Sequence, residues 1–316
     1  MSTCKLLIKW KIYVNLIIIL HEGEILIIDS HCHSWKYWPY QQKNNHEPNQ
    51  IPVPNPETWG NIDQLKYEMK INKIDYATIV SAQIWNNTDN NDYVNESIKH
   101  QKKFFQFIDF DSYWSNNYQT NGALDRLEKI KMSKNVIGIT QYLGEDDGKW
   151  LVSTEGRKLF QAINQKKMIV SISCNPRHIK NIRKLAEIFP KMPILLHHMG
   201  GMKSGSINKV ENNEVLESSK FKNIFLKFSG YNYVLGEDRR WDFPYNDALW
   251  VYKEAYQKFG SNMVWGSDFP VVKFSSTYKQ SFEVFNKYCD FMSENDKNLI
   301  QGNNLAKLIK ERGKID

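Results

Sequence analysis

The chain is poor in cysteine: its 316 residues include only Cys4, Cys32, Cys174 and Cys289. No two of them form a Cys-x-x-Cys pair, and their spacing is not that of a disulfide framework. A disulfide-stapled secreted scaffold is therefore excluded, and we expect a protein of the reducing cytoplasm. Cys174 ends an expected strand and so can line a pocket, but no base pattern accompanies it that would favour a nucleophile.

The sequence also lacks a run long enough for a membrane span. The nearest approach is the apolar stretch 12–20, which three lysines precede, so that the start of the chain superficially resembles a signal peptide. The stretch is short for a span, and no small-residue cleavage site follows it. The status of residues 1–24 stays open: an extra strand or plug beneath the domain, residues added upstream of the native start, or a real signal or anchor segment.

A one-sided accumulation of charge is missing as well. The net charge is +7, from 42 basic and 35 acidic residues, but the lysines are scattered, often at solvent positions of expected helices. A nucleic-acid-binding surface needs its excess charge on one face, so we expect neither a nucleic-acid nor a membrane partner. We expect a small-molecule substrate, and the sequence leaves self-association into a homo-oligomer open.

What the sequence does have, from residue 25 onward, is a regular alternation of short apolar strands and amphipathic stretches. Eight strand–helix units in succession predict a parallel sheet, and their number fits a (β/α)8 TIM barrel that forms a single domain over 25–316. The strands are expected at 25–31, 76–83, 104–110, 136–142, 168–174, 194–198, 224–230 and 263–268. The helices are expected near 61–73, 92–102, 121–131, 155–166, 176–189, 211–221, 246–259 and 276–291.

Two long connections interrupt this rhythm, at about 34–60 after the first strand and about 231–245 after the seventh. Loops that follow strands lie at the carboxyl end of a barrel, where barrel enzymes bind their substrates. Four residues of these loops are expected to contact a substrate: Trp35, Tyr231, Arg239 and Arg240. For the two arginines, the alternative is that they are solvated loop charges.

Three histidines and one aspartate fall at the carboxyl ends of expected strands. Because alternate side chains of a strand point the same way, His31 and His33 face one side together. His198 ends the sixth strand, which leaves His197 pointing out or sideways. Asp268 ends the eighth strand, the neighbour of the first in a closed barrel. Three imidazoles and one carboxylate suit a single borderline divalent ion, zinc first and manganese less tightly.

The segments that carry this constellation also carry a family resemblance. They read DSHCHSW at 29–35, LLHHMG at 195–200 and VWGSDFP at 264–270, with KFSG at 227–230 and GNNLA at 302–306 as lesser landmarks. Together they resemble the amidohydrolase superfamily, and most closely its amidohydrolase-2 branch of metal-dependent TIM-barrel hydrolases. The resemblance covers about residues 25–310.

The resemblance implies relatives that hydrolyse lactones of sugar acids and of pyrone dicarboxylates. It assigns His31, His33 and His198 to the metal or to polarising the substrate, and Asp268 to catalysis. Members often have an arginine in the fourth strand, where this chain has Gln141, so we expect an amide hydrogen bond to the substrate there. The fifth strand has neither the lysine nor the histidine of two-metal members. We therefore expect one metal, and metal-independent catalysis stays open.

These observations predict a hydrolase of carbohydrate metabolism that opens a lactone, with a sugar-acid lactone as the favoured substrate. Asp268 is the expected general base, while the metal or the histidines, His198 among them, polarise the ester carbonyl. Three alternatives are an amide or cyclic imide hydrolase, a non-oxidative decarboxylase of the same branch, and an inert binding barrel. Decarboxylases usually begin with Glu-x-His, and the Asp29-x-His31-x-His33 pattern therefore favours hydrolysis.

Overall fold

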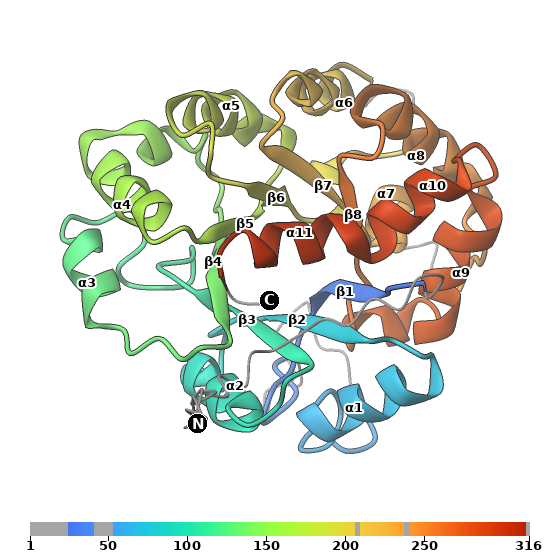
Figure 1. Ribbon diagram of the computed structural model, residues 1–316, viewed down its shortest axis with the longest axis horizontal. Coiled ribbons are helices and arrows are strands. Elements are labelled where there is room, and N and C mark those ends of the chain that lie inside the picture. The colour runs from blue at the N-terminus through green and yellow to red at the C-terminus, as the bar shows by residue number, and fades with distance from the viewer. Residues whose placement is uncertain (1–24, 41–52, 206–208, 237–240, 314–316) are drawn as a thin grey trace, which may run out of the picture.

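The computed structural model describes residues 25–40, 53–205, 209–236 and 241–313 (Figure 1). Eight strands pair in parallel, each with its neighbour in the sequence, in the order β1 to β8. The predicted (β/α)8 barrel is therefore confirmed. The strands are β1 (Ile28–Cys32), β2 (Tyr76–Val80), β3 (Phe104–Asp109), β4 (Val136–Tyr142), β5 (Ile169–Ser173), β6 (Ile194–Leu196), β7 (Ile224–Phe228) and β8 (Met263–Trp265).

Apolar side chains form separate clusters inside and outside the barrel. One cluster takes at least one side chain from every strand, including Phe107, Ile169 and Val264, and therefore fills the barrel interior. A larger cluster joins the strands to the surrounding helices. Strands that are buried on both faces read as nearly continuous apolar runs, which explains why all eight could be predicted.

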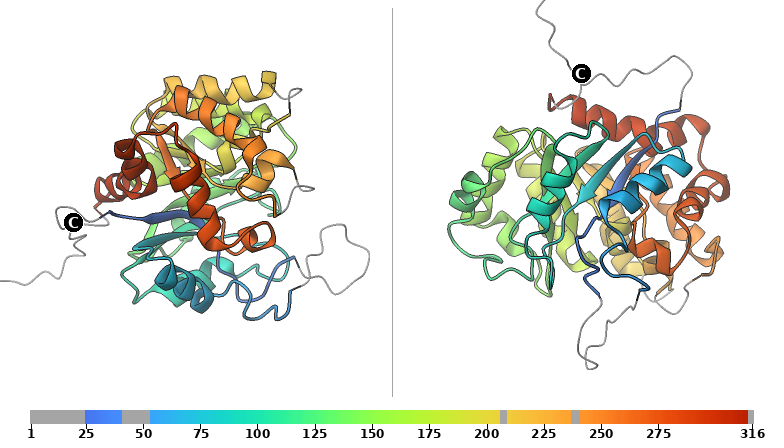
Figure 2. Two further views of the ribbon diagram at one scale, coloured as in Figure 1. Left: turned by 90° about the vertical axis from the view of Figure 1, so that its right-hand side faces the viewer. Right: turned by 90° about the horizontal axis from the view of Figure 1, so that it is seen from below.

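Helices surround the strands (Figure 2). In α4, for example, the Ser153 side chain caps the first turn by accepting from the Gly156 N–H, and Leu159, Phe160 and Ile163 form the buried stripe. The helices are α1 (Ile62–Ile71), α2 (Asn90–Ile98), α3 (Ala123–Lys129), α4 (Thr154–Gln165), α5 (Ile179–Ile188), α6 (Lys209–Leu216), α7 (Tyr231–Leu235), α8 (Asn246–Phe259), α9 (Tyr278–Tyr288), α10 (Glu294–Asn298) and α11 (Asn304–Lys310).

The amino-terminal end of the barrel is covered by α11, whose Leu305, Leu308 and Ile309 pack on the interior cluster (Figure 1). The second long connection contains α7 and is thus partly helical. Residues 1–24, and 41–52 of the first connection, lie outside the described residues. Among the described residues, no helix is long and apolar enough to cross a membrane.

The first and last strands meet at a seam. In the described part of the chain, one isolated parallel bridge, Cys32 to Phe269, joins them. The Asp268 N–H donates to the His31 carbonyl at 2.8 Å. Gly266 permits this close approach, because a Cβ there would lie 2.7 Å from the Cβ of His31. The seam therefore brings the two ends of the sequence together at one place.

Candidate active site

A hollow of about 330 Å³ opens at the carboxyl ends of the strands. His33 follows β1, Tyr142 ends β4, His197 follows β6 and Asp268 follows β8, and all four line the hollow. This is the end of a TIM barrel that carries catalysis. Most other side chains in the lining are aromatic or small and polar: Trp35, Tyr40, Tyr113, Trp114, Ser173, Cys174, Asn175 and Tyr233. Lys203 lines the hollow as well.

Two of the site strands end earlier than the sequence predicts. β6 stops at Leu196 and β8 at Trp265, so His198 and Asp268 belong to the turns that follow. Both residues have left-handed backbone conformations, with φ of +44° and +63°. Such conformations are uncommon for residues other than glycine and cluster at functional sites. Turn geometry, and not strand alternation, therefore aims these two side chains.

The turn after β6 also corrects the prediction for His197. Its side chain points neither out nor sideways: His197 is 1% exposed, and its ring centroid lies 4.4 Å from that of His31. Nε2 of His197 lies 2.6 Å from the Ser171 hydroxyl, while Nδ1 is buried without a hydrogen-bond partner among the described residues. The site therefore contains four imidazoles, one more than predicted.

Asp268 lies at the centre of this cluster and is 2% exposed. The distances from its Oδ1 to Nε2 of His31, His33 and His198 are 3.6, 3.6 and 3.8 Å. Its Oδ2 accepts a hydrogen bond from the Tyr233 hydroxyl at 3.0 Å. One oxygen is thus held by a tyrosine, and the other faces the imidazoles.

Hydrogen bonds to Nδ1 orient two of these rings. Nδ1 of His33 lies 2.7 Å from the Val80 carbonyl oxygen, which can only accept, so Nδ1 donates in this hydrogen bond and Nε2 is the ring nitrogen left for a ligand. Nδ1 of His198 lies 3.0 Å from the Ser229 hydroxyl. Burial lowers the pKa of His198 to about 4, so this imidazole is neutral at pH 7.

His31 has a different partner, a lysine inside the barrel. Nζ of Lys227 lies 3.1 Å from Nδ1 of His31 and 5.1 Å above the centre of the Phe107 ring. Burial lowers the pKa of Lys227 to about 7 and that of His31 well below its usual value. In the sequence, Lys227 stands out only as part of the KFSG landmark. A lysine in the apolar strand 224–228 was the available signal.

In the part of the chain that the structure describes, two overlapping sets of side chains could hold a metal ion, and both include His31. They are His31, His33 and Asp268, and His31, His197 and His198, with ligand atoms within 4.8 Å of one another in each set. A tetrahedral zinc site with bonds of about 2.1 Å has edges of about 3.4 Å, close to the 3.6 Å distances in the first set. Nε2 of His31 is also buried, and no described residue forms a hydrogen bond with it. The first set fits one divalent ion.

The predicted substrate contacts fall into three groups: one lines the hollow, two are buried elsewhere and two lie outside the described residues. Trp35 lines the hollow, stacked on the ring of His33 at a centroid distance of 4.8 Å. Cys174 lines it too, and burial raises the pKa of its thiol to about 12, so it is no thiolate nucleophile at pH 7. Arg239 and Arg240 lie outside the described residues.

Tyr231 and Gln141 are buried away from the lining of the hollow. Tyr231 begins α7 and packs into the outer core, where its hydroxyl donates to the Ser281 carbonyl. The tyrosine of α7 that reaches the hollow is Tyr233. In β4 the residue that does so is Tyr142, because successive side chains of a strand point to opposite faces. Neither tyrosine was singled out from the sequence.

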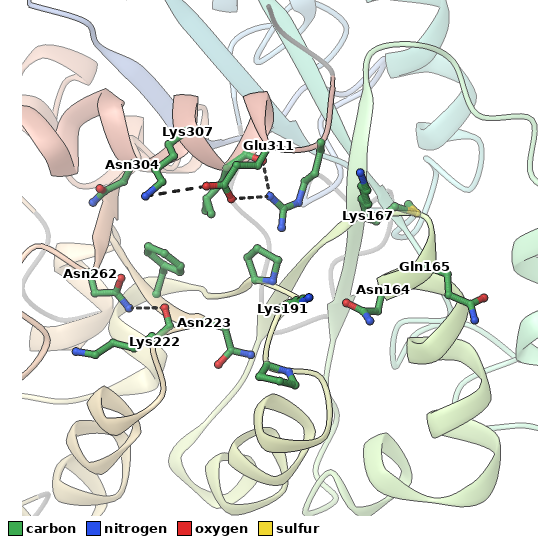
Figure 3. Close-up of a pocket in the computed structure, with 16 residues that line it drawn as sticks. Asn164, Gln165, Lys167, Lys191, Lys222, Asn223, Asn262, Asn304, Lys307 and Glu311 are labelled. Atoms are coloured by element: carbon green, nitrogen blue, oxygen red, sulfur yellow. Dashed lines mark hydrogen bonds and ion pairs between the residues drawn. The ribbon is translucent and has the colours of Figure 1, made fainter.

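A second hollow, of about 660 Å³, lies at the opposite end of the barrel beside α11 (Figure 3). Its lining includes Met168, Pro193 and Asn262, which directly precede β5, β6 and β8. That end of a TIM barrel serves stability. The described lining is mainly lysine, asparagine and proline, without a histidine, so the chemistry belongs to the smaller hollow.

A barrel with a histidine and aspartate cluster at its carboxyl end defines a class of TIM-barrel enzymes. A family model described as amidohydrolase matches residues 28–309. The match spans the whole barrel, and the chain therefore belongs to the amidohydrolase family. A search of curated proteins found no significant match.

Solved structures share the fold. An amidohydrolase from Burkholderia multivorans with bound zinc has a TM-score of 0.72 and 14% identity, over 90% of this chain and 99% of its own. A probable 2-pyrone-4,6-dicarboxylic acid hydrolase from Acinetobacter baumannii has a TM-score of 0.66 and 16% identity, over 90% and 99%. 5-Carboxyvanillate decarboxylase from Sphingomonas paucimobilis has a TM-score of 0.57 and 12% identity, over 91% of this chain and 99% of its own. At these identities the likeness shows the fold alone.

Proposed function

We propose that this protein hydrolyses a lactone, and that its substrate is the lactone of a sugar acid. The observation that carries the proposal is the buried Asp268, with one oxygen bonded to Tyr233 and the other facing imidazoles. A general base needs this placement beside a polarised ester carbonyl. One structural relative is described as a hydrolase of a pyrone, a ring that contains a cyclic ester, and this supports an ester substrate.

The lining of the hollow favours a neutral ring. At about 330 Å³ the hollow lies within the usual size of small-molecule sites, and the partly exposed ring of Trp114 offers apolar surface to the C–H groups of a sugar. The described lining has one cationic side chain, Lys203, whose Nζ donates to the Tyr233 carbonyl at 2.6 Å. A dicarboxylate would need more positive charge than these residues supply.

In the proposed reaction a water beside Asp268 attacks the lactone carbonyl carbon and gives its proton to the Asp268 carboxylate. The ring C–O bond then breaks, and the leaving alkoxide takes that proton back from Asp268, which restores the carboxylate. With the Ser229 hydroxyl donating to Nδ1, His198 has its proton on Nε2 and can donate it in a hydrogen bond to the carbonyl oxygen. Tyr233 holds the carboxylate in place through both steps.

We propose one divalent metal for this site, zinc before manganese, held by His31, His33 and Asp268. When bound, it polarises the carbonyl and lowers the pKa of the attacking water. The Val80 carbonyl, by accepting from Nδ1 of His33, leaves Nε2 of that ring available as a ligand. We further propose a cytoplasmic location, because Cys32, Cys174 and Cys289 are all free thiols.

The test is a pH-indicator assay of the zinc-supplemented protein against a panel of aldonolactones, with Asp268→Asn measured beside the wild type. We expect acid release from at least one lactone and a loss of about 10²- to 10⁴-fold in the variant. A wild type that is inactive on the whole panel would overturn the proposal. The same protein would then be assayed for carbon dioxide release from aromatic acids and for hydrolysis of cyclic imides.

A further inference from the structure

One hydroxyl in the hollow has no part in the reaction proposed above. Tyr142 ends β4, and its side chain lines the hollow beside His197. Its ring packs against Trp114 and His197, at centroid distances of 4.6 and 5.4 Å. These contacts give the ring a defined position in the wall of the hollow.

The hydroxyl of Tyr142 is buried and has no hydrogen-bond partner among the described residues. Its backbone, by contrast, is satisfied: the N–H donates to the Ser112 hydroxyl, and the carbonyl accepts from the Tyr113 N–H, both at 3.0 Å. Burial raises the pKa of the phenol well above its usual value, so the group stays a protonated donor. A buried donor without a partner is costly, and native proteins have few of them.

The same wall holds a second polar atom of this kind. Nδ1 of His197 is buried without a hydrogen-bond partner, although Nε2 of that ring is bonded to Ser171. Tyr142 and His197 adjoin each other at the ends of β4 and β6. Tyr233 differs from both, because its hydroxyl already bonds Asp268. Among the described residues that line the hollow, the buried side-chain atoms without a hydrogen-bond partner are the Tyr142 hydroxyl oxygen and Nδ1 of His197, which points to a ligand that supplies the missing partner.

We propose that Tyr142 is a substrate-binding residue whose hydroxyl donates a hydrogen bond to an oxygen of the bound substrate. This rests on the proposed lactonase function and adds a requirement: the lactone has a hydroxyl or carbonyl oxygen on the side that faces β4 and β6. An analogue without that oxygen leaves the phenol unpaired in the complex and is therefore discriminated against.

Tyr142→Phe removes only the hydroxyl oxygen and keeps the ring contacts. For the aldonolactone that the wild type hydrolyses best, we expect kcat/KM to fall about tenfold, with the melting temperature unchanged or higher. Tyr252→Phe is the matched control, because the Tyr252 hydroxyl is also buried without a partner but lies in α8, outside the hollow. The control should keep wild-type kinetics.

A series of lactones that each lack one hydroxyl then locates the partner oxygen. The wild type should disfavour one deoxy-lactone about tenfold, and Tyr142→Phe should not distinguish it from its parent. If the partner is the carbonyl oxygen, the variant loses kcat on every lactone alike. Wild-type kinetics in Tyr142→Phe would overturn this inference but leave the proposed function standing. If such a variant also melted at a lower temperature, the role of the hydroxyl would be purely structural. A wild type without lactone turnover would overturn the proposed function, and this inference with it.

Discussion

Asp29 and Ser267 join the first and last strands of the barrel through two hydrogen bonds to one carboxylate. The Ser267 N–H donates to Oδ1 of Asp29 at 2.9 Å, and its hydroxyl donates to Oδ2 at 2.6 Å. The same carboxylate accepts from the Tyr278 hydroxyl at 2.7 Å and from the His31 N–H at 3.0 Å. It therefore ties the strand that presents His31 to the turn that presents Asp268.

Asp29→Asn should weaken this seam. An amide has one acceptor oxygen, and its NH2 group would face a donor of Ser267 or Tyr278, which leaves buried hydrogen bonds unmade. We expect the free energy of unfolding to fall by about 1–3 kcal/mol and the affinity for zinc to fall with it. Urea unfolding and calorimetric zinc titration measure the two effects.

Ser30→Ala is the control for the seam, because the neighbouring Ser30 hydroxyl is buried and has no hydrogen-bond partner in the described part of the chain. It should unfold at nearly the wild-type urea concentration. If Asp29→Asn does the same, the carboxylate does not hold the seam.

Tyr233→Phe removes the hydrogen bond to Oδ2 of Asp268 and leaves the ring in place. We expect kcat to fall roughly fivefold with a smaller change in KM, because the base loses a neutral hydrogen bond that orients it. Steady-state kinetics on the best lactone of the panel checks this. In the control Tyr231→Phe, the lost hydroxyl served the Ser281 carbonyl, and only stability should fall. Equal kcat losses in the two variants would contradict an orienting role for Tyr233.

Asp109 should make stability depend on pH. Burial raises its pKa from 3.8 to about 6, although it accepts hydrogen bonds from Gln83, Ser112 and Trp114. The folded state holds this proton more tightly than the unfolded state. The contribution to stability is therefore full below pH 4 and is lost as the pH rises through 6. Over about two pKa units it amounts to about 3 kcal/mol.

The measurement is urea unfolding of the wild type and Asp109→Asn between pH 3.5 and 7.5. Relative to the variant, the wild type should lose stability from about pH 4 to 6 and stay level above that. A constant difference across the range would show that Asp109 does not titrate as described.

Removal and return of zinc should change the melting temperature of the protein even when no substrate is present. A ligand present at about 100 times its dissociation constant stabilises the folded state by about 2.7 kcal/mol. Zinc should therefore raise the melting temperature of the chelator-treated wild type, but should have little effect on His33→Ala. His100→Ala, at an exposed position outside the hollow, should respond like the wild type. If zinc leaves the melting temperature of the wild type unchanged, this result would contradict zinc binding by His31, His33 and Asp268.

Local sequence patterns predicted those parts of the site that depend on regular strands. His31 and His33 lie in and directly after β1, and strand alternation placed them on one face; their ring centroids are 4.9 Å apart. The same rule misplaced His197, because β6 ends one residue before it. Lys227 had a visible signal in its apolar strand, but its contact with His31 spans 196 residues and needs the closed barrel.

The sequence by itself determined the eight strands, their order and the ends at which polar side chains accumulate. Strands buried on both faces must be apolar along their length, and this requirement is readable residue by residue. Only the tertiary structure decided that Asp268 faces three imidazoles, that Tyr233 and not Tyr231 holds it, and that Tyr142 turns to the hollow. Those outcomes depend on left-handed turns and on the β1–β8 seam, where residues more than 200 positions apart meet, and no local pattern encodes such distances.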